Sequence, residues 1–417
     1  MPIDSLRVLR LLPLSLLTLL LTAAAQDDLP KRVDELERRN AELESRLDAL
    51  ADEQEGLLLG DLVPPLGEGR YGLGTAASKV YGTDQGLSLG GYGEALYERH
   101  NGSGEDEIDF LRAVLYVGYR FDEHWVFNSE LEFEHAGEEV GVEFATLDYL
   151  HSAALNARTG LVLIPMGLVN ELHEPTAFLG ARRPETERRI LPSTWREVGA
   201  GVFGDAGPVS YRAYVVNGFD ATGFSAEGLR DGRQNGSEAL AEDLAVVARA
   251  DWTETPGLLA GGSVYTGGAG QDQPGLGSTT TTIGELHADW RSHGLWLRGL
   301  VAMANVDDVA ALNAANGFVG ADSVGEEMEG LYVEAGYDVL GLLCPESGQS
   351  LSPYVRFESF DTQKEVPTGF ASDPANDQEI LTMGLNWRPI SNIVFKAEYQ
   401  DLDEQPDGVN LAMGFVF

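Results

Sequence analysis

Five arginines lie close together in the longest connection between the predicted strands, which runs from Ile164 to Arg196. They are Arg182, Arg183, Arg188, Arg189 and Arg196. A guanidinium stays charged at physiological pH and binds carboxylate or phosphate with two parallel hydrogen bonds. Because a long loop in a compact fold is usually functional, we predict that this one folds into a lumen and narrows it. Glu185, Glu187 and Glu197 could instead neutralise the arginines, which would leave the loop as a brace for the wall.

A second basic group is defined by strand parity, since alternate residues of a strand face the same side. Seven basic residues fall at predicted inward positions: Arg112, Arg158, Arg212, Arg249, Arg298, Arg356 and Lys396. They come from different strands, and together they could line one side of the lumen as a track for anions. The alternative is pairing inside the lumen, because acidic residues also take inward positions: Glu94, Glu130, Glu132, Glu334, Glu358 and Glu398.

Motifs for enzymatic chemistry are weak. Gly199 to Gly204 matches G-x-G-x-x-G, but it lies in a strand-like stretch with no helix after it. Glu171, His173 and Glu174 carry metal-binding atoms, yet no second histidine stands at helical spacing. We therefore predict no metal, no cofactor and no enzyme, although a Ser/His or Asp/His hydrolase site stays open with nothing to mark it.

The elements that position these residues are short alternating strands. Apolar residues at odd positions from Leu111 to Phe121 alternate with a mixed set that includes Arg112 and Arg120. After a tight turn, the segment from Trp125 places aromatic and aliphatic residues on one face and acidic residues on the other. This period of two predicts hairpins with an apolar exterior and a largely charged interior.

Residues 86–417 are therefore predicted to form an all-β fold, a transmembrane antiparallel β-barrel of about sixteen strands. Short connections, such as those near Asp122, Gly207 and Pro389, alternate with long ones, as a barrel with turns on one side of a membrane and loops on the other requires. Such a barrel cannot be filled by its own side chains, so it leaves an aqueous channel.

The C-terminus supports this prediction. Val409, Leu411, Met413, Phe415 and Phe417 form the apolar face of a last strand that ends on an aromatic residue. This ending resembles that of bacterial outer-membrane barrels, and the resemblance implies that the barrel-assembly machinery recognises Phe417.

The N-terminus predicts export. Arg7 and Arg10 precede an apolar run from Leu11 to Thr22, and three alanines follow it. These are the three parts of a secretory signal peptide, which we place at residues 1–25. No later stretch is apolar enough for a spanning helix, so a membrane fate requires a barrel, in the bacterial outer membrane.

A heptad pattern follows the signal peptide. Its a and d positions are Val33, Leu36, Asn40, Leu43, Leu47 and Leu50. This spacing predicts an α-helical coiled coil over residues 26–55, in the periplasm, with a polar residue that fixes register at one a position. A single amphipathic helix lying on another surface is the alternative. Residues 56–85 are rich in glycine and proline and are predicted to be a linker.

The net charge of −39 excludes nucleic acid as a partner, because electrostatic binding to phosphate backbones needs a basic face. The acidic runs of the predicted loops are either solvated surface or sites that gather divalent cations, as neighbouring lipopolysaccharide does. Cys344 stands alone, so no disulfide within the chain is predicted.

Several stretches resemble the phosphate-selective porin O and P family. They are 109–121, Ser129 to Glu132, Ile164 to Gly167, Asn170 to Pro175, Arg183 to Glu185, Thr194 to Glu197 and Tyr214 to Gly218. The resemblance is densest between Gly90 and Gly236, and it implies a trimeric, sixteen-stranded porin, in some members with a periplasmic coiled coil. Phosphate is not carried over, because this chain has four lysines after the signal peptide and only Lys396 is predicted to face the lumen.

The resulting expectation is a porin, a passive channel for small hydrophilic solutes or ions. The arginine-rich loop is the candidate source of anion selectivity. Its expected partners are two further copies of the chain, the lipid and lipopolysaccharide of the outer membrane, and the assembly machinery. The alternative is a structural tether of the envelope that acts through the coiled coil.

Overall fold

The computed structural model describes residues 31–47, 66–100, 105–403 and 407–417. The chain divides into two compact units, Met1–Asp61 and Leu62–Phe417, which we describe separately. The predicted signal peptide and Leu50 of the predicted heptad lie outside the described residues.

The first unit contains an α-helix over residues 31–47. Ion pairs between residues one turn apart support it, with Arg46 and Glu42 2.9 Å apart. Val33, Leu36, Leu43 and Leu47 are between 46% and 63% exposed, so the apolar stripe has no cover within the described residues. In the part of the chain that the structure describes, no helix is both long and apolar enough to cross a membrane.

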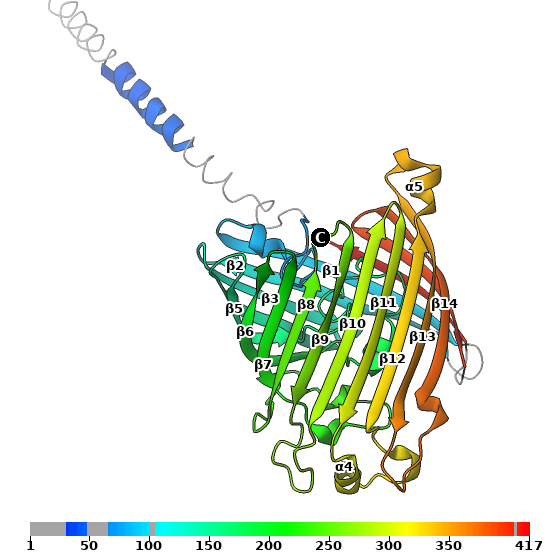
Figure 1. Ribbon diagram of the computed structural model, residues 1–417. Helices are drawn as coiled ribbons and strands as arrows, with labels where there is room; N and C mark the ends of the chain where they lie inside the picture. Colours follow the sequence, from blue (N-terminus) through cyan, green and yellow to red (C-terminus); the bar gives the residue numbers. More distant parts are fainter. Residues whose placement is uncertain (1–30, 48–65, 101–104, 404–406) are drawn as a thin grey trace, which may run out of the picture. The chain divides into compact units, whose positions relative to one another are not determined.

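The described residues of the second unit form sixteen antiparallel strands that close into a barrel (Figure 1). The strands are β1 (Gly86–His100), β2 (Glu107–Arg120), β3 (Trp125–Glu134), β4 (Glu139–Leu150), β5 (Asn156–Leu163), β6 (Arg196–Ala206), β7 (Val209–Asn217), β8 (Leu244–Trp252), β9 (Leu258–Gly267), β10 (Thr281–Ser292), β11 (Leu295–Val306), β12 (Glu327–Tyr337), β13 (Ser350–Glu365), β14 (Asp377–Ile390), β15 (Ile393–Leu402) and β16 (Gly408–Val416). The predicted fold class and strand number are confirmed.

Short helices lie between the strands. The α-helices of this unit are α3 (Glu185–Arg189), α4 (Val309–Asn316) and α5 (Val339–Leu343). The 3₁₀ turns are η1 (Lys79–Gly82), η2 (His135–Gly137), η3 (Ala221–Gly223), η4 (Arg230–Gly232), η5 (Gly320–Asp322), η6 (Pro345–Ser347) and η7 (Pro374–Asn376). Figure 1 shows α4 and α5 at opposite ends of the barrel, the long-loop end and the short-turn end respectively.

The barrel closes where β1 pairs with β16, from Tyr92 opposite Val416 to His100 opposite Gly408. Beyond the last strand, the Phe417 amide donates to the Gly91 carbonyl at 2.9 Å, and the Gly91 amide donates back at 3.0 Å. Gly91 has no side chain, and a Cβ there would lie 2.3 Å from the Val114 carbonyl oxygen and 2.7 Å from the Phe417 ring. The last residue of the chain therefore completes the closing seam.

The strands alternate between an apolar exterior and a mixed interior, which carries apolar clusters as well as charged side chains. In β11, for example, Val301 and Met303 are exposed whereas Trp296 and Arg298 are buried inside. Inward positions of other strands carry Glu130, Asp148 and similar charged side chains, all of them buried. The period of two in the sequence thus becomes two chemically different surfaces.

Residues 66–85, which we call the strap, differ from the expected linker. Leu73, Ala76, Ala77, Val80 and Tyr81 are all at most 4% exposed. They pack against the inward side chains of neighbouring strands, in a cluster that includes Tyr92, Val114, Tyr116, Val126 and Phe144. The sequence hides this packing because the strap has the glycine content of a linker, and only the barrel supplies the apolar surface that buries it.

We expect Gly91→Val to weaken the closing seam, because its side chain collides with backbone of β2 and with Phe417. Overpacking of this kind costs about 1–3 kcal/mol. Urea unfolding followed by tryptophan fluorescence measures the change. Gly284→Val in β10 is the matched control, since a Cβ there meets nothing within 4 Å. Equal unfolding midpoints for the two variants would contradict this role of Gly91.

Candidate functional site

The connection between β5 and β6, residues 164–195, folds into the barrel and crosses its interior. We call it the constriction loop. Its apolar residues Ile164, Met166, Val169 and Ile190 have no exposed surface, and Leu168 has 1%. An inward-folded loop must satisfy its backbone amides without water. Carboxylates of the wall accept from several of them.

Three acidic side chains, two of the far wall and one of the loop, join the loop to the wall. Glu398 of β15 accepts from the amides of Ala181, at 2.6 Å, and Arg182, at 3.2 Å. Glu358 of β13 accepts from the Thr186 amide at 3.1 Å. From the loop side, Glu187 accepts from the Tyr332 hydroxyl at 2.7 Å. The loop is thus bonded to strands that are distant from it in the sequence.

Four of the five predicted loop arginines are paired with acids. Arg182 contacts Glu98 and lies 3.8 Å from Glu185. Arg188 and Arg189 also bind Glu185, at 3.0 and 3.4 Å, and Arg189 reaches Glu227 at 2.6 Å. Arg196 binds Glu143 at 2.6 Å.

Glu185 is the centre of this group. Burial by itself raises the pKa of its carboxyl, but the guanidiniums of Arg188, Arg182 and Arg189 outweigh burial and hold the pKa below its ordinary value. One buried carboxylate therefore offsets part of the charge of three arginines. These ion pairs hold the loop in place, and the loop keeps part of its positive charge.

Arg183 is different, because no carboxylate of the described residues forms an ion pair with it. It donates to the His173 carbonyl at 3.4 Å. The loop between β7 and β8 brings two further arginines to the same region, Arg230 and Arg233, which the sequence analysis did not single out. Arg233 donates to the carbonyls of Pro192, at 3.4 Å, and Ser193, at 3.3 Å, both in the constriction loop.

Carboxylates near Arg230 and Arg233 offset their charge only in part. Asp231 lies near both, and Glu143 and Glu197 lie near Arg233, but no described carboxylate forms an ion pair with either. Burial, together with nearby Arg233, Arg188 and Arg183, lowers the pKa of Arg230 to about 9. Burial and nearby Arg196 lower the pKa of Arg233 to about 10. Both remain protonated at neutral pH, and a buried Arg230 Nη1 has no hydrogen-bond partner among the described residues. Positive charge is therefore concentrated where the two loops meet.

The predicted wall arginines all face inward, and each is paired with an acid. Arg112 has acidic partners at Glu94, Glu132 and Glu134, between 3.2 and 3.5 Å away. Arg356 binds Glu358 at 2.7 Å and Glu334 at 3.3 Å. Arg158 binds Asp148 and Arg298 binds Asp289, both at 2.9 Å. Internal pairing, the alternative left open by the sequence, accounts for these side chains.

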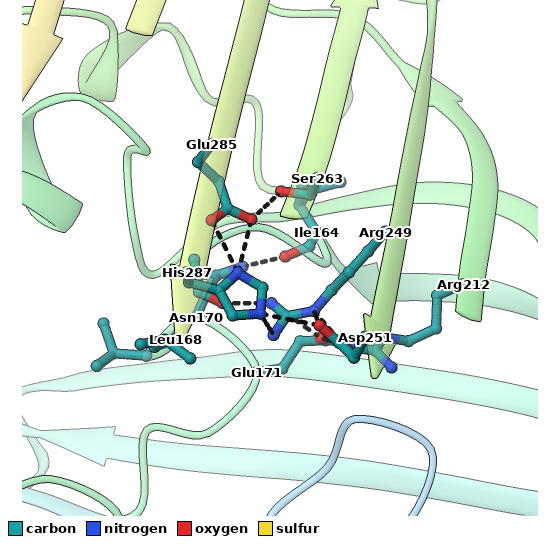
Figure 2. Close-up of polar contacts among 12 residues, drawn as sticks. Ile164, Leu168, Asn170, Glu171, Arg212, Arg249, Asp251, Ser263, Glu285 and His287 are labelled. Atoms are coloured by element: carbon teal, nitrogen blue, oxygen red, sulfur yellow. Dashed lines mark hydrogen bonds and ion pairs between the residues drawn. The ribbon is translucent and has the colours of Figure 1, made fainter. Parts of the chain in front are cut away.

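The remaining pairs form the network shown in Figure 2. Asp251 accepts from Arg212 at 2.9 Å and from Arg249 at 2.8 Å, and the His287 ring lies 2.8 Å from it. The other nitrogen of His287 contacts Glu285 at 2.8 Å. Arg212 also binds Glu171 of the constriction loop at 2.9 Å. One network of ion pairs therefore joins the wall to the constriction loop. It gives its buried charges oppositely charged partners, without which their burial would be costly.

Lys396, the predicted lumen lysine, holds the loop as well. Its Nζ donates to the Gly180 carbonyl at 2.8 Å and lies 3.6 Å from the centre of the Phe178 ring. His173 and Glu174, to which the sequence analysis gave no role, also join the loop to its surroundings. His173 lies 3.0 Å from Glu130, and Glu174 binds the strap.

A cavity of about 1130 Å³ lies between the strap, the constriction loop and the wall. Its lining includes Arg70 of the strap, Glu171 of the loop and Arg388 of β14. Arg388 donates to the Thr176 carbonyl at 2.8 Å and forms no ion pair with a described carboxylate. Within the described residues, no three metal-ligating side chains converge on one point.

Comparison with known proteins shows a relative of this chain. No family model matches it. An uncharacterized protein of Aquifex aeolicus (strain VF5) is 37% identical over 354 residues, which cover 81% of this chain and 80% of that protein. The chain belongs to the same family as this protein.

Solved porin structures share its fold. OmpF of Salmonella typhi, solved with daunomycin, matches with a TM-score of 0.53, 12% identity, and coverage of 80% of this chain and 98% of OmpF. The trimer form of Vibrio cholerae OmpT matches with a TM-score of 0.52 and 11% identity, over 79% and 99% of the two chains. The anion-selective porin of Comamonas acidovorans matches with a TM-score of 0.50 and 11% identity, also over 79% and 99%. At these identities the likeness shows a porin-type fold.

We expect Glu398→Ala to loosen the constriction loop, because two of its amides and the Tyr354 hydroxyl lose their acceptor. Hydrogen bonds to charged groups contribute about 1.5–3 kcal/mol each. Limited trypsin digestion, with cleavage after Arg182 as the readout, should therefore be faster. Glu379→Ala, on the exposed face of β14, is the control. Identical cleavage rates would show that Glu398 does not hold the loop.

Proposed function

We propose that this protein is an outer-membrane porin, a passive diffusion channel for small hydrophilic solutes. The observation that carries the proposal is a closed barrel with an apolar exterior, a partly charged interior and one loop folded across its lumen. Sixteen strands enclose more space than their own side chains can fill. The barrel thus provides a path for water that the constriction loop narrows.

The exterior supports the placement in a membrane. Trp125, Trp252, Trp290 and Trp387 are exposed by about two-fifths of their surface, and all lie near the short-turn end of their strands. Phe110, Phe133 and Tyr399 are similarly exposed toward the long-loop end. Two aromatic girdles flanking an apolar band are typical of outer-membrane barrels, whose short turns face the periplasm. The signal peptide over residues 1–25 and the recognition of Phe417 during assembly belong to the same proposal.

Selectivity for anions is proposed to come from Arg183, Arg230 and Arg233. The paired wall arginines add little net positive charge, because each carboxylate cancels the field of its partner. The three loop arginines lie where the constriction loop meets the β7–β8 loop and have no ion pair with a described carboxylate. Phosphate is not part of the proposal, and membership of the phosphate-selective porin O and P family remains a prediction.

Planar-bilayer recording across a salt gradient tests the channel and its selectivity together. We expect discrete conductance steps and a reversal potential on the anion side. Arg230→Gln with Arg233→Gln should move the reversal potential toward cations. One unit charge about 10 Å away in water changes the energy of a monovalent ion by about 0.4 kcal/mol. The change has opposite signs for an anion and a cation, so each arginine alters the anion-to-cation permeability ratio roughly fourfold.

The control is Arg99→Gln, which removes one positive charge from an exposed position of β1 and is compared with Arg230→Gln and Arg233→Gln as single variants. An equal shift in the control would assign selectivity to the overall charge of the protein. A cation preference of the wild type would contradict the anion proposal and leave a general porin. A folded barrel that gives no steps would contradict the channel itself.

A second candidate, a tether of the envelope, is favoured by the exposed stripe of the helix over residues 31–47. We propose that Val33, Leu36, Asn40, Leu43 and Leu47 form a coiled coil with two further copies of the chain in the periplasm. The trimer form of Vibrio cholerae OmpT, which shares the fold, supports a trimer of the barrel.

Deletion of residues 29–55 separates the two candidates. We expect the shortened protein to conduct as the wild type does, because no residue of the lumen is removed. The assay is single-channel recording combined with detergent sensitivity of cells that carry the deletion. Normal conductance with a leaky envelope would support the tether as an additional role, whereas lost conductance would show that the porin needs its N-terminal segment.

A further inference from the structure

The strap covers one of two large apolar clusters inside the barrel, and the other one packs against the constriction loop. The wall residues under the strap, which we call its seat, are inward side chains of β1 to β5 and β16, among them Tyr92, Val114, Tyr116, Phe144 and Val416. An apolar patch of this kind in a water-filled barrel would be costly unless another part of the chain covered it. The strap is that cover.

The fit between strap and seat depends on a glycine. A Cβ on Gly118 of β2 would lie 2.6 Å from the Cβ of Val80. Real side chains do not approach so closely, so any larger residue at 118 would push the strap away from β2. Val80 itself is 1% exposed, which shows how completely this position is filled.

Polar contacts join the strap to the constriction loop. Glu174 of the loop accepts from the amides of Ala76, at 2.8 Å, and Ala77, at 3.3 Å. It also accepts from the Thr75 hydroxyl at 3.0 Å. Burial is the main cause that raises the pKa of Glu174, and these hydrogen bonds oppose it. A displacement of the strap would therefore remove the partners of a buried loop carboxyl.

Polar contacts also join the strap to the wall. The Tyr81 hydroxyl donates to Asp148 at 2.7 Å and accepts from Arg158 at 2.9 Å. Asn128 of β3 donates to the Ala77 carbonyl at 2.9 Å. None of these contacts belongs to the strand ladder, which closes between β1 and β16 without the strap. The barrel can therefore keep its closure if the strap leaves.

The strap also forms part of the wall of the 1130 Å³ cavity, through residues 69 to 75. We propose that the strap is a displaceable inner lid of the pore, seated against Gly118 and interlocked with the constriction loop through Glu174. Its displacement from this position widens the passage. This inference rests on the proposed porin function.

Two variants test the lid. Gly118→Val should expel Val80 and raise single-channel conductance, and Gly284→Val is its matched control. Deletion of residues 66–82 removes the lid itself and should raise conductance at least as much. Heat-modified migration on gels verifies that each barrel is folded.

Thiol labelling reports the position of the strap without reference to conductance. Cys344 is exposed, so it is first replaced by Ser. Ser78→Cys then places a thiol of nearly the same size at a strap position that is 4% exposed. A small maleimide should label it slowly in this background and much faster when Gly118→Val is added.

The outcomes are distinguishable. Faster labelling with larger steps in Gly118→Val, and larger steps in the deletion, support the lid. Steps of wild-type size in the folded deletion overturn it, whatever the labelling shows. An absence of steps in both wild type and deletion contradicts the porin function, whereas steps in the deletion alone show a channel that the strap holds shut.

Discussion

The structure depends on the pairing of every backbone amide and carbonyl of the wall. Inside a membrane no water is available to satisfy an open strand edge, so the sheet must close on itself. β1 and β16 meet along a continuous register, and the Phe417 backbone adds the last bonds to Gly91. Gly91 has no Cβ because the seam leaves no space for one. Closure of sixteen strands fixes the circumference of the barrel. The lumen inside is too wide for the side chains of the wall to fill, so other segments of the chain must line or fill it.

The interior is filled by loops, which form an apolar cluster with inward residues of the wall, and by ion pairs. The constriction loop buries its own apolar residues and takes its hydrogen bonds from carboxylates of distant strands. The strap covers another apolar part of the wall. Charged side chains of the wall pair with one another, because an unpaired charge in a tightly packed lumen is costly. The Asp251 network shows how wall and loop are held by the same interactions.

Charge that remains uncompensated is correspondingly informative. Arg230 and Arg233 lie on one loop and Arg183 on another, and the contacts of Arg233 with the constriction loop bring them together. Burial is the main cause that lowers the pKa of Arg230 and Arg233; nearby arginines add to it, and nearby carboxylates oppose it. The protein carries a net charge of −39, so its overall charge gives no hint of this local positive region.

The sequence by itself determined the barrel. Period-two alternation, as in Leu111 to Phe121, marks each strand and its two faces, and alternating turn lengths order the strands, because both are local properties. The inward direction of Arg112, Arg356 and Lys396 followed from the same parity. Only the tertiary structure decided what those side chains meet. Strand register decides that the acidic partners are Asp148, Asp251 and Asp289. The paths of the loops decide that Arg230 and Arg233 reach the constriction loop and that the strap packs against the wall. These bring together residues far apart in the chain, and no local pattern encodes that proximity.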